Sequence, residues 1–458
     1  MPHHMNPQIR MAFLAWLTTP LIAGMTAQAQ PTNTVWTELG GGVNGPVIAV
    51  LEGNGDTLVV VGDFTVAGGV PANHVALWDG NSFSGMGSGV GGNISSAAMV
   101  NGVPYIGGDA LSSNYNDIAY WDGNAWVFGN AFSGNYPQVT TLFEHDGTLY
   151  AGGITAGFAG LDDHVLRLVN GNWEPVGGTL NNLVRCLGWH DGRIVAGGDF
   201  TALQNGGGTN LNHVAIITGS DWGPLGVGLP DAVNALQDMD GTLYAGGPIR
   251  TGGVQDFGLA RFALGASTWE MLMPGSTAYV PMGAPDYPAV NALCTDGDHL
   301  ILGGKFPLDV NGVTGSHVAR FDGSADAFTP LASFNDAVSV LAWTSPWGLV
   351  AGGSFTMEGS TVANHLAHTD QATSINTTER AVGPFIFPNP VVDQLLLSGV
   401  PPMDGVVEVY GLDGRRLSAT AHLHTGQATL DVSSLAPGLY LLRLTVNGQP
   451  ESLRFIKE

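Results

Sequence analysis

The sequence VAGGDF at residues 195–200 belongs to a motif that recurs seven times between residues 59 and 355. Each copy is an apolar run that ends in a small pair of residues. Successive copies are 45 to 57 residues apart. This spacing suits four short strands per unit, as in a propeller blade, and exceeds the roughly 33 to 34 residues of common helical repeats. The second glycines of the copies are Gly62, Gly108, Gly153, Gly198, Gly247, Gly304 and Gly353.

Each repeat unit divides into four predicted strands, a to d. Strand a resembles AVNALQD, strand b is the glycine-containing run, and strand c resembles NHVALW. The a–b turn is often Asp-Gly, which suits a two-residue hairpin. The glycines of strand b allow close approach of neighbouring backbones.

Strand d starts with an aromatic residue, and these aromatics reveal how the repeats close. They are Trp36, Phe83, Trp126, Trp173, Trp222, Trp269 and Phe328. Trp36 precedes the first glycine motif, whereas no strand d follows the last one. The strand at Trp36 is therefore predicted to complete the last blade, which closes the ring. We predict a seven-bladed β-propeller over residues 30–372.

The GG-x-F and W-x-x-x-G patterns resemble those of kelch-type and related bacterial propellers. The resemblance extends over residues 36–370. It implies the fold but not an activity, because this architecture serves enzymes, binding proteins and scaffolds.

Composition restricts the class of protein. Gly contributes 68 of 458 residues without a collagen period, and 44% of residues are hydrophobic, so a sizeable core is available. The formal net charge is −24. A chain this acidic repels phosphate backbones and anionic lipid, so nucleic acid and anionic membrane surfaces are not expected as partners.

Residues 1–29 resemble a secretory signal peptide. Arg10 supplies the positive charge, an apolar run follows, and Ala27-Gln28-Ala29 is a small-residue cleavage site. A membrane anchor is the alternative, but the run is short and contains Pro20. No other apolar stretch is long enough to span a membrane. The two cysteines, Cys186 and Cys294, lie in apolar strands and are expected to be buried free thiols, although export would permit a disulfide.

The pattern changes after residue 372. We predict a polar linker at 373–383 and a small Ig-like β-sandwich at 384–458. This segment resembles the type A C-terminal sorting domain of the type IX secretion system; an ordinary adhesive domain is the alternative. The motif residues are Pro388, Asn389, Pro390, Gly414, Arg415, Gly438, Tyr440 and Lys457. The resemblance implies the type IX machinery as a partner, with its outer-membrane translocon and sorting-domain protease. The protein is then secreted or attached to the outer cell surface.

Candidate binding residues gather where strand b ends. Asp63, Asp109 and Asp199 follow the glycine pair and are expected on one face, where they either bind a cation or sugar hydroxyls or cap turns. The variable b–c loops and the connection at 273–289 emerge on the same face. Tyr279 and Tyr287 in that connection either stack on a ligand or pack the loop.

No catalytic, metal or cofactor set is predicted. Five histidines, His74, His164, His213, His317 and His365, share one strand-c slot, which Asp117 and Phe257 or Gly258 fill in the other units. One histidine per blade does not converge on one metal, so these residues are expected to satisfy groups within their own blades. Arg167, Arg261 and Arg320 share a slot that also accepts Leu77 and Ile216, which does not fit a carboxylate clamp.

Three functions are compatible with these patterns. The preferred one is a non-catalytic, exported propeller that binds a glycan, a protein or a surface component through the b–c face. The alternatives are a polysaccharide hydrolase or lyase that uses acidic residues on that face, and a purely structural surface protein.

Overall fold

The computed structural model contains only β-strands as regular elements among the residues it describes, which confirms the all-β prediction. The predicted signal peptide lies outside these residues. Contacts divide the chain into two compact units, Met1–Ala372 and Thr373–Glu458. The described residues are 34–53, 56–132, 135–157, 160–204, 210–249, 258–272, 288–310, 313–345, 347–369, 385–387, 391, 393–398, 408–411, 415–417, 420–424, 427–446 and 449–457.

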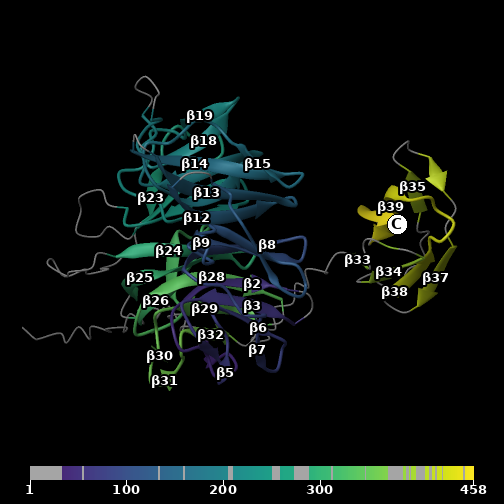
Figure 1. Cartoon of the computed structure of the whole chain (residues 1–458), viewed down its shortest axis with the longest axis horizontal. Helices are drawn as coiled ribbons and strands as arrows, with labels where there is room; N and C mark the ends of the chain where they lie inside the picture. Colours follow the sequence, from purple (N-terminus) through teal and green to yellow (C-terminus); the bar gives the residue numbers. More distant parts are fainter. Residues whose placement is uncertain are drawn as a thin grey trace, which may run out of the picture. The chain divides into compact units, whose positions relative to one another are not determined.

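In the first unit, the described strands form seven four-stranded antiparallel sheets (Figure 1). Sheet one contains β2 (Val47–Glu52), β3 (Leu58–Gly62), β6 (Val75–Trp78) and β7 (Phe83–Gly85). Sheet two contains β8 (Asn93–Val100), β9 (Val103–Asp109), β10 (Ile118–Trp121) and β11 (Trp126–Gly129). Sheet three contains β12 (Asn135–His145), β13 (Thr148–Gly157), β14 (Gly160–Val169) and β15 (Asn172–Pro175). Sheet four contains β16 (Val184–His190), β17 (Arg193–Gly198), β18 (Val214–Thr218) and β19 (Asp221–Pro224).

The remaining sheets follow the same plan. Sheet five contains β20 (Ala235–Met239), β21 (Thr242–Gly246), β22 (Leu259–Ala263) and β23 (Glu270–Leu272). Sheet six contains β24 (Ala289–Thr295), β25 (Leu300–Val310), β26 (Val313–Asp322) and β27 (Ala327–Pro330). Sheet seven contains β28 (Val338–Thr344), β29 (Gly348–Gly353), β32 (Leu366–Thr369) and β1 (Trp36–Glu38). Short hairpins, β4 (Val66–Ala67) with β5 (Val70–Pro71) and β30 (Met357–Glu358) with β31 (Thr361–Val362), lie in two b–c loops.

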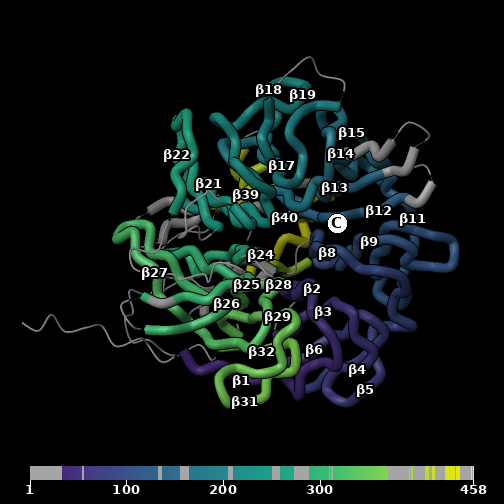
Figure 2. Tube along the Cα trace, turned by 90° about the vertical axis from the view of Figure 1, so that its left-hand side faces the viewer, coloured from purple at the N-terminus to yellow at the C-terminus, as the bar shows by residue number. Residues whose placement is uncertain are grey.

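The seven sheets form a ring. The first strand of each sheet contacts the first strand of the next, and β28 contacts β2 (Figure 2). The outer strand of sheet seven comes from the other end of the unit, because β1 pairs with β32 in the register Trp36–Thr369. The side chain of Glu38 also accepts a hydrogen bond from Asn364 N at 2.8 Å. The predicted partner of the Trp36 strand is thus the one observed.

Apolar side chains fill every gap between neighbouring sheets. Seven buried clusters each combine residues of two adjacent sheets. The cluster that joins sheets seven and one contains Val350 and Leu366 together with Val47 and Leu58. The core is therefore divided among the gaps and continues through the point of closure.

Both glycines of the repeated motif have a packing reason. A Cβ atom on the second glycine would lie under 3.0 Å from a backbone oxygen at the start of strand a in the same sheet, in all seven sheets. A Cβ atom on the first glycine would lie equally close to a valine of the next sheet, as for Gly197 with Val233 and Gly352 with Val47. The motif thus marks where one sheet approaches the next.

The strand-d aromatics join neighbouring sheets. The indole N–H of Trp126 donates to Met86 O at 3.0 Å, that of Trp269 to Leu225 O at 3.0 Å, and that of Trp36 to Leu331 O at 2.9 Å. Each acceptor belongs to the preceding sheet's strand d or the residues after it. Trp173 differs from the other six aromatics because it is only half-buried.

The second unit contains two four-stranded antiparallel sheets. One consists of β33 (Phe385–Phe387), β34 (Gln394–Ser398), β38 (Gln427–Asp431) and β37 (Thr420–His424). The other consists of β36 (Arg416–Leu417), β35 (Glu408–Gly411), β39 (Gly438–Val446) and β40 (Gln449–Lys457). Both contribute fully buried side chains, among them Leu395, Leu430, Leu442 and Phe455.

Candidate functional site

The three aspartates predicted to share a face lie at the ends of β3, β9 and β17, in sheets one, two and four. Asp63 has 80% of its side chain exposed and lies 3.8 Å from the ring of His74. Asp109 accepts a hydrogen bond from Asn93 N at 3.3 Å. Asp199 forms an ion pair with Arg185 at 2.9 Å. Each aspartate thus contacts a partner in its own sheet, and their role in ligand binding stays a prediction.

The other predicted binding residues, Tyr279 and Tyr287, lie outside the described residues. Within the described part of the chain, no group of three or more His, Cys, Asp or Glu side chains is arranged to hold a metal ion. Cys186 and Cys294 are free, and burial raises the pKa of both thiols, that of Cys294 to about 12.

At least three of the five strand-c histidines contact groups of their own sheets, as expected. The Nδ1 atoms of His74, His213 and His365 lie 3.0–3.2 Å from the carbonyl oxygens of Gly62, Gly198 and Gly353. The backbone of each histidine is left-handed, with φ between 63° and 70°. This conformation turns the ring back onto the glycine pair, away from a common ligand.

Two of the three arginines of the other strand-c slot pair with carboxylates beside them. Arg167 contacts Glu174 at 3.2 Å, and Arg261 contacts Glu270 at 2.9 Å and Asp326 at 2.6 Å. These ion pairs occupy the guanidinium groups locally.

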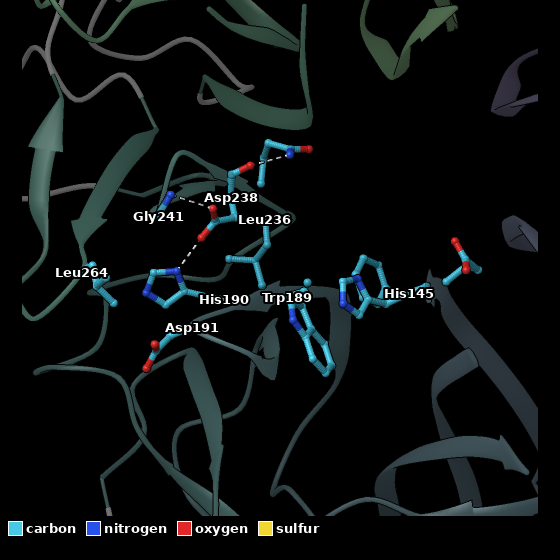
Figure 3. A pocket seen from close by; sticks show the side chains of 12 residues that line it. His145, Trp189, His190, Asp191, Leu236, Asp238, Gly241 and Leu264 are labelled. Carbon is cyan, nitrogen blue, oxygen red and sulfur yellow. Dashed lines mark hydrogen bonds and ion pairs between the residues drawn. The ribbon is translucent and has the colours of Figure 1, made fainter. Parts of the chain in front are cut away.

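A cavity of about 420 Å³ opens at the opposite ends of the strands (Figure 3). We call the edge of the ring that carries the a–b and c–d turns the a–b rim. The cavity lies there, over the gaps between sheets three, four and five. Its lining is Phe143, Glu144, His145, Gly188, Trp189, His190, Asp191, Leu236, Gln237, Asp238, Gly241 and Leu264.

One wall of the cavity is a stack of rings. His145 at the end of β12 stacks on Trp189 of β16, with ring centroids 4.0 Å apart and 21° between the planes. Phe143 lies parallel to His145 on its own strand, at 6.3 Å. Figure 3 shows Leu236 beside this wall. The stack provides a broad, partly apolar surface that joins sheets three and four.

A partly buried hydrogen bond fixes the neighbouring wall. The ring of His190 is 2% exposed, and its Nδ1 atom lies 2.5 Å from Asp238 Oδ2 in the next sheet. The other carboxylate oxygen of Asp238 accepts Gly241 N at 3.1 Å. Because both oxygens are held, the carboxylate keeps a fixed orientation toward the cavity.

The cavity is acidic. Three carboxylates line it, those of Glu144, Asp191 and Asp238, and the lining contains no Lys or Arg. Glu144 accepts Gly147 N at 2.7 Å, and Asp191 pairs with Arg193 at 2.6 Å outside the lining. The site therefore offers fixed hydrogen-bond acceptors beside an aromatic wall and disfavours anionic ligands.

The sequence interpretation placed binding on the b–c face and did not identify this cavity. It interpreted the Asp146-Gly147 and Asp191-Gly192 pairs as hairpin turns, which they are. The missed signal was the residue before each turn, since His145 and His190 directly precede these pairs.

Fold and cavity define an all-β protein with a propeller-like ring. The second unit matches a known domain family: residues 385–458 fit the model of the secretion system C-terminal sorting domain. This match confirms the predicted type IX sorting domain, and the protein is therefore secreted or attached to the outer cell surface. Of the motif residues, Tyr440 stacks on Phe455 at 5.5 Å, Lys457 is buried and pairs with Gly438, and Arg415 is exposed. Pro388, Asn389, Pro390 and Gly414 lie outside the described residues.

Solved structures that are similar to the chain include a sialidase and a β-fructofuranosidase. The Trypanosoma rangeli sialidase in complex with sialic acid has 13% identity and a TM-score of 0.31, with 82% of this chain and 85% of that chain covered. The Bombyx mori GH32 β-fructofuranosidase BmSUC1 has 10% identity and a TM-score of 0.22, with 91% and 87% covered. At these scores the similarity supports no argument about the site. A search of curated proteins finds no match. Among the described residues, no helix is a candidate for crossing a membrane.

Proposed function

We propose that the chain is an exported, non-catalytic, seven-bladed kelch-like propeller that binds a ligand at the cell exterior. The cavity on the a–b rim carries this proposal. Its aromatic stack offers contact area, and its anchored carboxylates offer hydrogen-bond acceptors without a further ordering cost. The b–c face with Asp63, Asp109 and Asp199 is the second candidate, and these three residues lie outside the lining of the cavity.

The export route is part of the proposal. Residues 1–29 act as the signal peptide, and residues 384–458 form the Ig-like sandwich that the type IX translocon and the sorting-domain protease recognise. The boundaries 30–372 and 373–383 delimit the propeller and its linker. The support is the order of the segments, because the matched sorting domain lies after the ring.

A binding screen against glycans and surface proteins tests the function. Trp189→Ala should weaken binding roughly tenfold or more, because loss of a buried aromatic contact at a binding site is costly. Leu264→Asp provides a second test, since Leu264 lines the cavity while 63% exposed, so the fold should tolerate the change. Tyr120→Ala, at an exposed aromatic of β10, is the control.

Unchanged affinity in both cavity variants would rule out this site. The same mixtures report catalysis. Release of shortened products from a polysaccharide would favour the alternative of a hydrolase or lyase that uses acidic residues of the propeller.

A further inference from the structure

We propose that the ligand of the a–b rim is an extended glycan chain without anionic groups, which crosses the mouth of the ring from Trp189 to Trp343. This inference rests on the proposed function and specifies its ligand class. It starts from one position that recurs on strand a of all seven sheets. We call it the rim slot: the residue that pairs with the first residue of strand b or its neighbour, next to the a–b turn.

The pairing registers define the rim slot. Its members pair with Leu58, Pro104, Leu149, Ile194, Leu243, Leu300 and Leu349. In sheet order, the slot holds Glu52, Met99, Glu144, Trp189, Asp238, Thr295 and Trp343. The slot thus contains three carboxylates, two tryptophans and no basic residue.

At least three of the seven side chains in the rim slot reach back to the preceding sheet. Trp189 stacks on His145 of sheet three, and Asp238 binds His190 of sheet four. Glu52 of sheet one accepts Ser345 N of sheet seven at 3.2 Å. At these three gaps the slot residue lies between two sheets, where a ligand on the rim can meet it.

The two tryptophans supply separate platforms. Trp189 lines the cavity, and Trp343 of β28 is 44% exposed. Sheets four and seven, which carry the two tryptophans, are three steps apart in a ring of seven sheets and so lie on opposing sides of the ring (Figure 2). A ligand that uses both must be extended, which excludes a single sugar or a small metabolite.

The chemistry of the rim slot selects the ligand class. Indole faces pack against the C–H faces of sugar rings, and carboxylates accept hydrogen bonds from hydroxyl groups. Glu52, Glu144 and Asp238, within a chain of net charge −24, repel uronate and sulfate groups. A glycan chain of uncharged or amine-bearing sugars satisfies both conditions.

Length dependence tests the inference with the full chain. An array of uncharged and anionic glycans identifies the best uncharged glycan, and its oligosaccharides of increasing length serve as the probe. Affinity should rise with oligosaccharide length until the oligosaccharide reaches across the ring from Trp189 to Trp343. Trp189→Ala should weaken binding at every length, and Trp343→Ala should weaken only the long oligosaccharides, each by roughly fivefold to tenfold. Tyr120→Ala should leave the affinity for short and for long oligosaccharides unchanged.

Charge discrimination is the second measurement. The anionic glycans should bind at least about tenfold more weakly than uncharged ones. The double variant Glu52→Gln with Glu144→Gln keeps one acceptor oxygen on each side chain and removes two charges, so it should narrow this difference. Thermal melts of the variants provide the control for folding.

The outcomes separate this inference from the proposed function. If only Trp189→Ala weakens binding, and does so at every oligosaccharide length, the ligand still binds in the cavity. That result would support the proposed function but would overturn the inference that the glycan extends to Trp343. Preference for anionic glycans, or binding only to a peptide, would overturn the ligand class. Unchanged binding in both tryptophan variants would overturn the inference and the cavity site together.

Discussion

Asp117 shows how a single side chain takes over a structural role. It occupies the slot that histidine fills in other sheets, and its backbone carbonyl accepts Gly108 N at 3.0 Å, as His74 O accepts Gly62 N. Its carboxylate is fully buried and accepts Ala131 N at 2.7 Å and Phe132 N at 2.9 Å. A histidine contacts the glycine pair, whereas this aspartate fixes the chain after strand d.

The burial of Asp117 predicts a pH effect. Burial raises the pKa of this carboxyl to about 6, although the two backbone donors lower it. The unfolded value is about 3.9. The folded state therefore holds the proton more tightly, and this residue's contribution to stability falls as the pH rises from about 4 to 6. Above about pH 6 the contribution of Asp117 to the free energy of unfolding no longer changes with pH.

Urea denaturation at several pH values tests this effect with Asp117→Asn. The difference in unfolding free energy between wild type and variant should change by about 2 kcal/mol between pH 4 and 7, since one pKa unit corresponds to about 1.4 kcal/mol. A constant difference over this range would show that Asp117 keeps its usual pKa.

For single residues, the sequence predicted a structural role for the strand-c histidines, but it did not predict which residues line the cavity. A residue shared by most repeats predicts a local contact, as with His213 and Gly198. The cavity depends on side chains that differ between repeats, such as Trp189 and Asp238. These side chains come from neighbouring sheets. The repeat pattern predicts which sheets are neighbours but not which of their side chains come into contact.

Among the elements, strand b limits how closely the sheets approach. The first glycine of its motif faces a valine of the next sheet, and the second faces the backbone of its own strand a. The sequence predicted close approach at these glycines but not which of the two faces the neighbour. Neighbouring residues of a strand face opposite sides of the sheet, so only one of the two glycines meets the next sheet.

Gly352→Ala tests this packing where the ring closes. Its Cβ atom would meet Val47 of sheet one and Val340 of its own sheet under 3.0 Å. Overpacking there should lower the unfolding free energy by about 1–3 kcal/mol. Gly129→Ala is the matched control, because its nearest neighbour lies at 3.8 Å. Equal stability of the two variants, measured by denaturant melts, would contradict the packing.

For the whole molecule, all strands of the ring precede the sorting domain in the sequence. The strand that completes sheet seven begins at Trp36, and the third strand of that sheet ends at Thr369, shortly before the second unit starts at Thr373. Removal of the second unit leaves all pairing strands of the ring in place. The ring is therefore expected to survive proteolytic release of its sorting domain.

The sequence predicted this closure from the count of strand-d aromatics, because Trp36 had no glycine motif before it. It did not predict the additional contacts that stabilise the junction. These are the Trp36 indole bond to Leu331 O, the Glu38 contact with Asn364 N, and the Trp347 indole bond to Asp56 O at 3.1 Å. Such contacts depend on side-chain geometry between residues about 300 positions apart.

A disulfide between the first and last strands of the ring tests the central claim most directly. Thr37 and His368 face each other in the β1–β32 register. In the double variant Thr37→Cys with His368→Cys, mild oxidation should link the two positions within one chain, and peptide mapping should recover the linked pair. Cys186 and Cys294, which are free and have raised thiol pKa values, should remain reduced. Two unlinked engineered thiols in a folded chain would show that the N-terminal strand does not close the ring.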